Sequence, residues 1–216
     1  MSMARTLGFK CGEYKANIRA NAPGRHHGGC FAGFAAINRS HDAMDDSPHI
    51  IPDLLAPDLK LVFCGSALGA ASAKARAFYA KPGNKFWPTL HAVGLTPRRF
   101  APAEYPLLLD LRIGLTDLNK TQSGNDTELS PAHDDPAALA DKIMRYRPGI
   151  LAFTAKRPAQ VFLHHRFGLK TPPAYGLQAQ TVGDTRLVVL PSPSGRAGSF
   201  WDIAPWQDLK RIADDI

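Results

Sequence analysis

Four short apolar runs recur along the chain after residue 50. They are "KLVFCG", "LRIGLT", "GILAFT" and "TRLVVL", at residues 60–65, 111–116, 149–154 and 185–190. Each run is nearly continuous in apolar residues, and this is typical of strands that are buried on both faces of a parallel sheet. The pattern therefore predicts four central strands.

Helical patterns lie between these runs, and we expect helices over residues 84–93, 136–146, 155–166 and from about 203. The stretch "HDDPAALADKIMRYRPG" is the clearest, because Asp134 or Asp135 can cap its start, Pro136 suits its first turn and "RPG" ends it. Alternating strands and helices predict an α/β fold. We expect a three-layer α/β/α sandwich with a short central, mostly parallel, four-stranded sheet.

Residues 1–49 follow a different pattern. They mix Gly, His, Asp and Ser without a sustained period of two or 3.6, so we expect a poorly structured N-terminal extension and one domain over residues 50–216. The segment "HHGGC" offers ligand-type side chains, but no second Cys/His pair has the spacing of a metal site. We therefore expect no metal.

Composition narrows the class of protein. The 216 residues are 44% hydrophobic and 21% charged, which is ordinary for a soluble globular protein. No apolar run approaches the ~20 residues of a membrane span, so we expect no membrane association. The first residues lack an apolar leader, so we do not expect secretion. Three irregularly spaced cysteines favour a reducing cytoplasm, and the net charge of +7 favours a polyanionic partner.

Ligands of such sheets bind beyond the carboxyl ends of the strands, which directs attention to three loops. The first loop begins with "GSALG", in which Gly65 and Gly69 allow a tight turn and a close approach of backbone amides to a ligand. Its spacing does not match the dinucleotide fingerprint G-x-G-x-x-G, and no Walker lysine follows it. A nucleotide-using enzyme is therefore a weak alternative.

The same loop continues into "FYAKPGNKFW", residues 78–87, with Tyr79 before a Pro-Gly corner and Asn84 at a helix start. With this stretch the chain resembles the mismatch-specific uracil/thymine DNA glycosylases, a branch of the uracil-DNA glycosylase superfamily. The resemblance covers residues 50–210 and is carried, in order, by "IPDLLAPDLKLVFCG", "YAKPGNKFW", "GLTDL", "YGLQ" and "LPSPSGRA".

The resemblance implies a monofunctional DNA glycosylase that excises uracil, or a related mispaired or deaminated base, by hydrolysing the N-glycosidic bond. The target base is extruded into a pocket, where it would stack on Tyr79 while backbone amides near Ser66 and Tyr79 stabilise the departing base. From position alone, Tyr79 could equally be a core aromatic and Asn84 only a helix cap. The implied base-binding pocket consists of Gly65, Ser66, Ala67, Gly69, Tyr79 and Asn84.

Ala67 is the main departure from the family pattern, because most relatives carry there an asparagine that holds the attacking water. Losing such a group typically costs ~10²–10³ in rate, or about 3–4 kcal/mol. Asp117 follows the second strand and could activate water and favour the sugar cation, with Thr116 as a second water contact. Alternatively, Asp117 caps a turn and Thr116 bonds its own backbone, or the pocket relies on strain, amide donors and phosphate charge.

The third loop, "LPSPSGRAGSFWD", follows the last strand at residues 190–202 and suits phosphate contacts. In the family this turn enters the minor groove, and Arg196 matches the wedge position of the thymine-excising relatives, although a solvated surface arginine is the alternative. We interpret Trp201 and Trp206 as core anchors. The predicted DNA-contacting set is Ser192, Ser194, Gly195 and Arg196.

The expected partner is DNA, either a mismatched duplex or a single strand, and we expect a monomer associated with DNA in the cytoplasm. We expect no cofactor, because no cysteine-rich set suggests an iron–sulfur cluster, and no lysine stands out as a Schiff-base nucleophile. A non-catalytic protein that binds DNA lesions or single strands remains an alternative. Basic residues around the first loop are candidates for phosphate contacts: Lys74, Arg76, Lys81, Lys85, Arg98 and Arg99.

Overall fold

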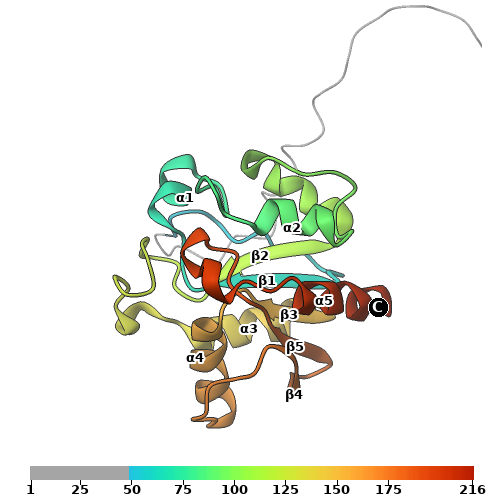
Figure 1. Cartoon of the computed structure of the whole chain (residues 1–216). Coiled ribbons are helices and arrows are strands. Elements are labelled where there is room, and N and C mark those ends of the chain that lie inside the picture. Colours follow the sequence, from blue (N-terminus) through green and yellow to red (C-terminus); the bar gives the residue numbers. More distant parts are fainter. Residues whose placement is uncertain (1–48) are drawn as a thin grey trace, which may run out of the picture. The chain divides into compact units, whose positions relative to one another are not determined.

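The computed structural model describes residues 49–216 (Figure 1). The "HHGGC" segment and all but the last residue of the expected N-terminal extension lie outside the described residues. That part of the domain prediction therefore stays a prediction.

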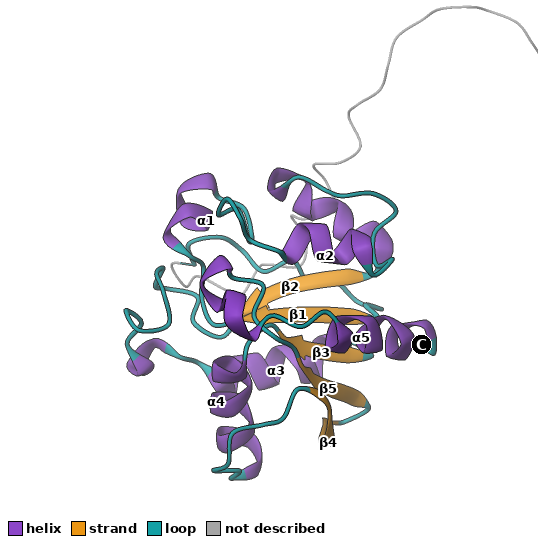
Figure 2. Ribbon diagram, viewed as in Figure 1, coloured by secondary structure: helices purple, strands orange, loops and turns teal. Residues whose placement is uncertain are grey.

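The described residues form one mixed sheet with helices on both faces (Figure 2). Its strand order is β2-β1-β3-β5-β4, in which all neighbours are parallel except the antiparallel pair β5 and β4. The strands are β1 (Leu61–Gly65), β2 (Ile113–Asp117), β3 (Ile150–Phe153), β4 (Gly176–Val182) and β5 (Thr185–Val189). The α-helices are α1 (Ala70–Ala75), α2 (Phe86–Ala92), α3 (Pro136–Tyr146), α4 (Lys156–Phe167) and α5 (Ala204–Asp214), and 3-10 helices cover Pro102–Leu111, Pro131–His133 and Gly195–Phe200.

Alternation along the buried strands generates the two interfaces of the sandwich. In β1, Leu61 and Phe63 face a core formed with α2 and α5, whereas Val62 and Cys64 face a second core formed with α3 and α4. Figure 1 shows α2 on one side of the sheet and α3 and α4 on the other. The prediction of a three-layer sandwich is therefore confirmed, and so are the four parallel strands.

The predicted strand number was wrong, because the sheet of the described residues has five strands and not four. The additional strand, β4, lies at the edge, and most of its residues alternate between partial and full exposure, so it forms no apolar run. Gly183 and Asp184 join β4 to β5, and Gly183 adopts the left-handed φ of 56° that a two-residue hairpin requires. For β4, the turn residues Gly183 and Asp184 indicate the strand better than its hydrophobic pattern does.

The helix predictions were correct where an apolar period exists. Helix α3 spans the predicted residues, and the Asp135 carboxylate caps it by accepting from the Ala138 amide at 2.8 Å. Helix α1 was missed because it has only six residues and an alanine-rich sequence without a period. The 3-10 helix at Pro102–Leu111 was missed because it contains Pro106, and an internal proline usually argues against a helix.

Trp206 anchors the final helix in the core. It is fully buried, its ring stacks on Phe63 with the centroids 5.7 Å apart, and its indole N–H donates to the Pro191 carbonyl at 3.2 Å. Trp201 is half-buried and packs against Trp206. Both tryptophans therefore belong to the core, as predicted. None of the helices within residues 49–216 combines the length and apolar character that crossing a membrane requires.

Candidate active site

A cavity of about 380 Å³ opens at the carboxyl ends of the parallel strands. The three predicted loops, which follow β1, β2 and β5, all contribute to it, together with the residues after β3. Figure 1 shows α1, the Gly195–Phe200 helix and α4 gathered at this end of the strands. Ten of the twelve predicted site residues line the cavity: Gly65, Ser66, Ala67, Gly69, Tyr79, Asn84, Asp117, Ser192, Ser194 and Arg196.

Backbone hydrogen bonds hold the loops against one another. The Asn119 amide in the second loop donates to the Ser66 carbonyl in the first loop at 2.8 Å. The Lys85 amide, at the end of the first loop, donates to the Pro193 carbonyl in the third loop at 2.8 Å. These contacts fix the cavity walls without using the side chains that face its interior.

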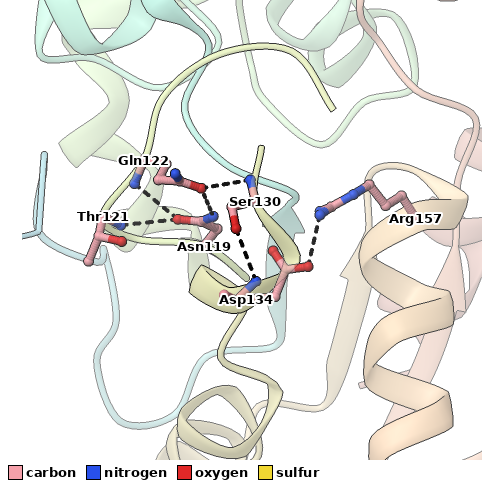
Figure 3. Close-up of polar contacts among 7 residues, drawn as sticks. Asn119, Thr121, Gln122, Ser130, Asp134 and Arg157 are labelled. Atoms are coloured by element: carbon pink, nitrogen blue, oxygen red, sulfur yellow. Dashed lines mark hydrogen bonds and ion pairs between the residues drawn. The ribbon is translucent and has the colours of Figure 1, made fainter. Parts of the chain in front are cut away.

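Asn119 organises the second loop (Figure 3), and sequence analysis did not identify it. Its side-chain oxygen accepts from the Gln122 amide at 3.0 Å, and its amide group donates to the Gln122 side chain at 3.1 Å. The Gln122 oxygen also accepts from the Ser130 amide at 3.0 Å. Further along, Asp134 pairs with Arg157 of α4 at 2.8 Å, so this loop is also tied to α4 (Figure 3).

Tyr79 is held in a strained backbone conformation by contacts on its ring and its hydroxyl. Its φ of 53° lies in the left-handed region, which is unfavourable for an aromatic residue and persists only where the surroundings enforce it. The ring stacks on Phe86 with the centroids 3.8 Å apart and the planes inclined by 14°. The hydroxyl forms a hydrogen bond with Thr154 Oγ1 at 3.2 Å.

Asp117, at the end of β2, is 5% exposed, and its side-chain oxygen Oδ2 has no hydrogen-bond partner in the described part of the chain. Burial raises the pKa of this carboxyl from 3.8 to about 7, and the positive charge of Lys120 opposes the rise. The carboxyl lies against Gly65, where an added Cβ would overlap Asp117 Oδ1. A carboxyl with such a pKa can exchange a proton near neutral pH, as a general base must.

Burial also raises the pKa of the Tyr79 hydroxyl well above its usual value, and the negative charge of Asp117 adds to this rise. The hydroxyl therefore stays neutral, and it can donate a hydrogen bond as well as accept one.

Thr116 does not join the cavity. Consecutive strand residues point to opposite faces, and the Thr116 hydroxyl donates to Asp53 Oδ1 at 2.8 Å, not to its own backbone. The role of Thr116 as a second water contact therefore lacks the geometry that it requires.

The glycines of "GSALG" differ in what the structure requires of them. Gly65 is needed because of the carboxyl beside it, whereas Gly69 has a φ of −67° and an added Cβ there would meet no atom within 4 Å. Ala67 lines the cavity between them and contributes only a methyl group. Asn84 lines the cavity and also caps α2, because its side-chain oxygen accepts from the Phe86 amide at 2.9 Å.

The third loop is shaped by its serines. Ser192 Oγ accepts from the Ser194 amide at 3.3 Å, and Ser194 Oγ accepts from the Arg196 amide at 3.4 Å. Arg196 is exposed and lines the cavity, whereas Gly195 is not part of the cavity wall and packs near the Gly83 carbonyl. The geometry is that of a stiff turn which carries an arginine at the rim of the site.

Sequence analysis missed several lining residues. Thr154 follows β3 and is 3% exposed, and the rule that pointed to the other strand ends applies equally to it. Ser72 lines the cavity from α1, and its hydroxyl accepts from the Ala80 amide at 3.0 Å. No pattern marked Asn125 and Asp126, which belong to the irregular part of the second loop.

The described residues include no group of three His, Cys, Asp or Glu side chains that could hold a metal ion. The polar groups at the cavity are instead two carboxyls, several hydroxyls, two side-chain amides and basic side chains.

Fold and site together define a three-layer α/β protein with an aromatic-walled pocket at the carboxyl edge of its sheet. The family model of the uracil DNA glycosylase superfamily matches residues 52–210. The chain belongs to this superfamily of DNA repair glycosylases.

A solved structure supports the fold. The solution NMR structure of a "putative Uracil DNA glycosylase" from Methanosarcina acetivorans is similar to this chain, with a TM-score of 0.52 and 23% sequence identity. The match covers 76% of this chain and 96% of that one.

Proposed function

We propose that this chain is a monofunctional DNA glycosylase that removes uracil, or a related deaminated or mispaired base, from DNA. The observation that carries the proposal is the position of the Asp117 carboxyl, which lies in one cavity with the Tyr79 ring and has an oxygen without a hydrogen-bond partner within residues 49–216. Membership of the superfamily supports DNA as the substrate class.

The cavity wall suits an everted base. Phe86 supports the Tyr79 ring from one side, so that a base entering the cavity can stack on the ring. Extruding a base costs a few kcal/mol, and stacking returns about 1–3 kcal/mol. Amides near Ser66 and Tyr79 and the side chain of Asn84 are the groups proposed to bind the base edge.

The proposed reaction is hydrolysis at the C1′ atom of the sugar. The bond between C1′ and the base nitrogen breaks, and its electron pair leaves with the base, whose negative charge the amide groups stabilise. Water adds to C1′ and gives a proton to the ionised Asp117 carboxylate, whose negative charge also favours the cationic sugar in the transition state. The products are the free base and an abasic site in an unbroken strand.

In this mechanism Asp117 replaces the polar group that is missing at Ala67. The methyl group of Ala67 cannot orient water, whereas the carboxyl of Asp117 lines the same cavity. The Thr116 hydroxyl is hydrogen-bonded to Asp53 and does not line the cavity, so Asp117 is the one of the two predicted catalytic residues that is placed to act on water.

Contacts with DNA are proposed for the third loop. Ser192 and Ser194 would contact phosphates, and Arg196 at the rim would fill the gap that the everted base leaves in a mismatched duplex. A guanidinium can stack in this gap and donate hydrogen bonds to the orphaned base.

The experiment uses a duplex with one uracil opposite guanine and a labelled uracil strand. Incubation with the protein followed by hot alkali is expected to cut the strand at the uracil, whereas incubation without alkali is not. Asp117→Asn should bind the duplex but release little base, and Asp214→Asn, which breaks only an exposed pair with Lys210 on α5, is the matched control. Equal base release by Asp117→Asn and wild type would refute the role of Asp117.

A second function, recognition of DNA lesions without catalysis, is favoured by Ala67, which leaves one catalytic position without a polar group. It predicts tight binding of the uracil duplex with no abasic site for alkali to cut. The same experiment therefore separates the two functions.

A further inference from the structure

A buried ionic cluster lies beside Asp117 and outside the main cavity. One carboxylate, that of Asp53, pairs with two ammonium groups, Lys120 at 2.7 Å and Lys142 at 2.6 Å. The side chains are 10%, 7% and 22% exposed, respectively. Taking three charges out of water costs several kcal/mol per ion, so a cluster of this kind is poorly explained by stability alone.

The cluster holds the backbone on both sides of Asp117. Thr116 directly precedes Asp117 and donates to Asp53 Oδ1 at 2.8 Å, and Lys120, three residues after Asp117, pairs with the same oxygen. Asp53 is itself fixed, because the next residue, Leu54, exchanges two backbone hydrogen bonds of 2.9 Å with Leu115 of β2. The end of β2 and the start of the second loop are therefore tied to one carboxylate.

The cluster also carries an excess of positive charge close to Asp117. Lys120, Lys142 and Asp117 share a second cavity of about 230 Å³. The two ammonium groups lower the pKa of Asp117 against the effect of burial, and the negative charge of Asp53 raises it. A nearby cation favours the ionised carboxylate, whereas a nearby anion disfavours it.

We propose that Asp53 and Lys120 are positioning residues for Asp117, which hold its carboxyl at the cavity and set the fraction of it that is ionised near neutral pH. The inference rests on the proposed function only in giving Asp117 a catalytic task. The hydrogen bonds and ion pairs that carry it are independent of that task.

The second cavity also contains four other ionisable side chains near Asp117: His49, His133, Asp134 and Asp135. The charges that shift the pKa of Asp117 are nevertheless those of Lys120, Asp53 and Lys142. Tyr79 of the first loop and Cys64 of β1 lie near Asp117, and both are neutral because burial raises their pKa values. The main cavity has three further charged side chains, which lie outside the buried cluster on segments that follow the strands: Lys81, Asp126 and Arg196. Apart from burial itself, the ionisation of Asp117 near neutral pH therefore depends on the charges of the buried cluster.

The test compares two substitutions that change the local charge in opposite directions. Lys120→Met removes a cation, so the carboxyl of Asp117 should titrate at higher pH, by on the order of one pH unit. Asp53→Asn removes an anion and can still accept from Thr116, so Asp117 should titrate at lower pH. Carbon-13 NMR of labelled aspartate carboxyls follows this titration directly, and the single-turnover rate of base release against pH follows its effect.

Controls separate charge from folding. Asp214→Asn, which disrupts an exposed pair on α5, should move neither the carboxyl titration nor the rate profile. Lys142→Met removes the other cation of the cluster and should repeat the upward shift, so the test remains available if Lys120→Met fails to fold. Circular dichroism and thermal unfolding establish that each variant is folded.

The outcomes are distinct. Opposite shifts for Asp53→Asn and Lys120→Met support the cluster, even if wild type releases no base and the proposed function fails. Shifts in the same direction, or an unchanged titration in folded variants, overturn the cluster's role, even if wild type is an active glycosylase.

Discussion

The ring of Tyr79 lies nearly parallel to the ring of Phe86, with the two centroids 3.8 Å apart. Phe86 is the first residue of α2 and is fully buried, so the stack joins Tyr79 to the core. Thr154, which follows β3, forms a hydrogen bond with the Tyr79 hydroxyl. The aromatic wall of the site is thus positioned by two elements, α2 and the end of β3.

The stack leads to a prediction for Tyr79. Tyr79→Ala should lower kcat/KM for a uracil duplex by about 10–100-fold, because stacking on an aromatic ring contributes about 1–3 kcal/mol per base. Tyr79→Phe keeps the ring and loses one hydrogen bond, of about 0.5–1.5 kcal/mol, so it should change kcat/KM much less. The comparison needs single-turnover kinetics over a range of enzyme concentrations. Wild-type efficiency in Tyr79→Ala would show that the base does not stack there.

Gly65 and Gly69 form a matched pair for a second prediction. Gly65→Ala places a methyl group against Asp117 Oδ1 and should displace the carboxyl, with a loss of base release comparable to that of Asp117→Asn. Gly69→Ala meets no atom within 4 Å and should retain base release. Both variants are assayed on the same uracil duplex. If the two alanine variants behaved alike, the contact between Gly65 and Asp117 would be irrelevant to catalysis.

The pKa of Asp117 predicts the pH dependence of the reaction. The carboxyl must be ionised to accept a proton from water, and burial raises its pKa to about 7. The single-turnover rate should therefore increase with pH through this region and level off above it. The measurement covers about pH 5.5 to 8.5 with saturating enzyme. A rate that is independent of pH over this interval would contradict general-base catalysis by Asp117.

The same pKa predicts a stability effect. A carboxyl whose pKa is raised on folding stabilises the protein at low pH, and this contribution is lost as the pH increases from about 4 to about 7. A rise in pKa from 3.8 to about 7 corresponds to a cost of up to about 4 kcal/mol above pH 7. Asp117→Asn should therefore increase the free energy of unfolding at pH 8 more than at pH 5. Urea titrations at both pH values measure this difference, and a loss of stability at pH 8 would contradict it.

The core of the fold was accessible from sequence because it depends on local patterns. Continuous apolar runs identified β1, β2, β3 and β5, and the common direction of parallel strands then implied that the following loops meet. The edge strand β4 was not accessible in this way, since most of its residues alternate between partial and full exposure and only its turn at Gly183 marked it.

The site was predictable to the extent that its residues follow strand ends. Asp117 was found on this basis, and Thr154 could have been. The alternation of a strand should have excluded Thr116, because neighbours in a strand face opposite sides. The pairing of Asp53 with Lys120 and Lys142 joins segments up to 89 residues apart, so no local pattern could reveal it.

The most direct test of the central claim is the amount of abasic site formed in a single turnover on a uracil–guanine duplex by wild type and by Asp117→Asn. If Asp117 activates the water, the variant should bind the duplex as wild type does and react about 10²–10⁴-fold more slowly. Equal rates for the two proteins would contradict the account.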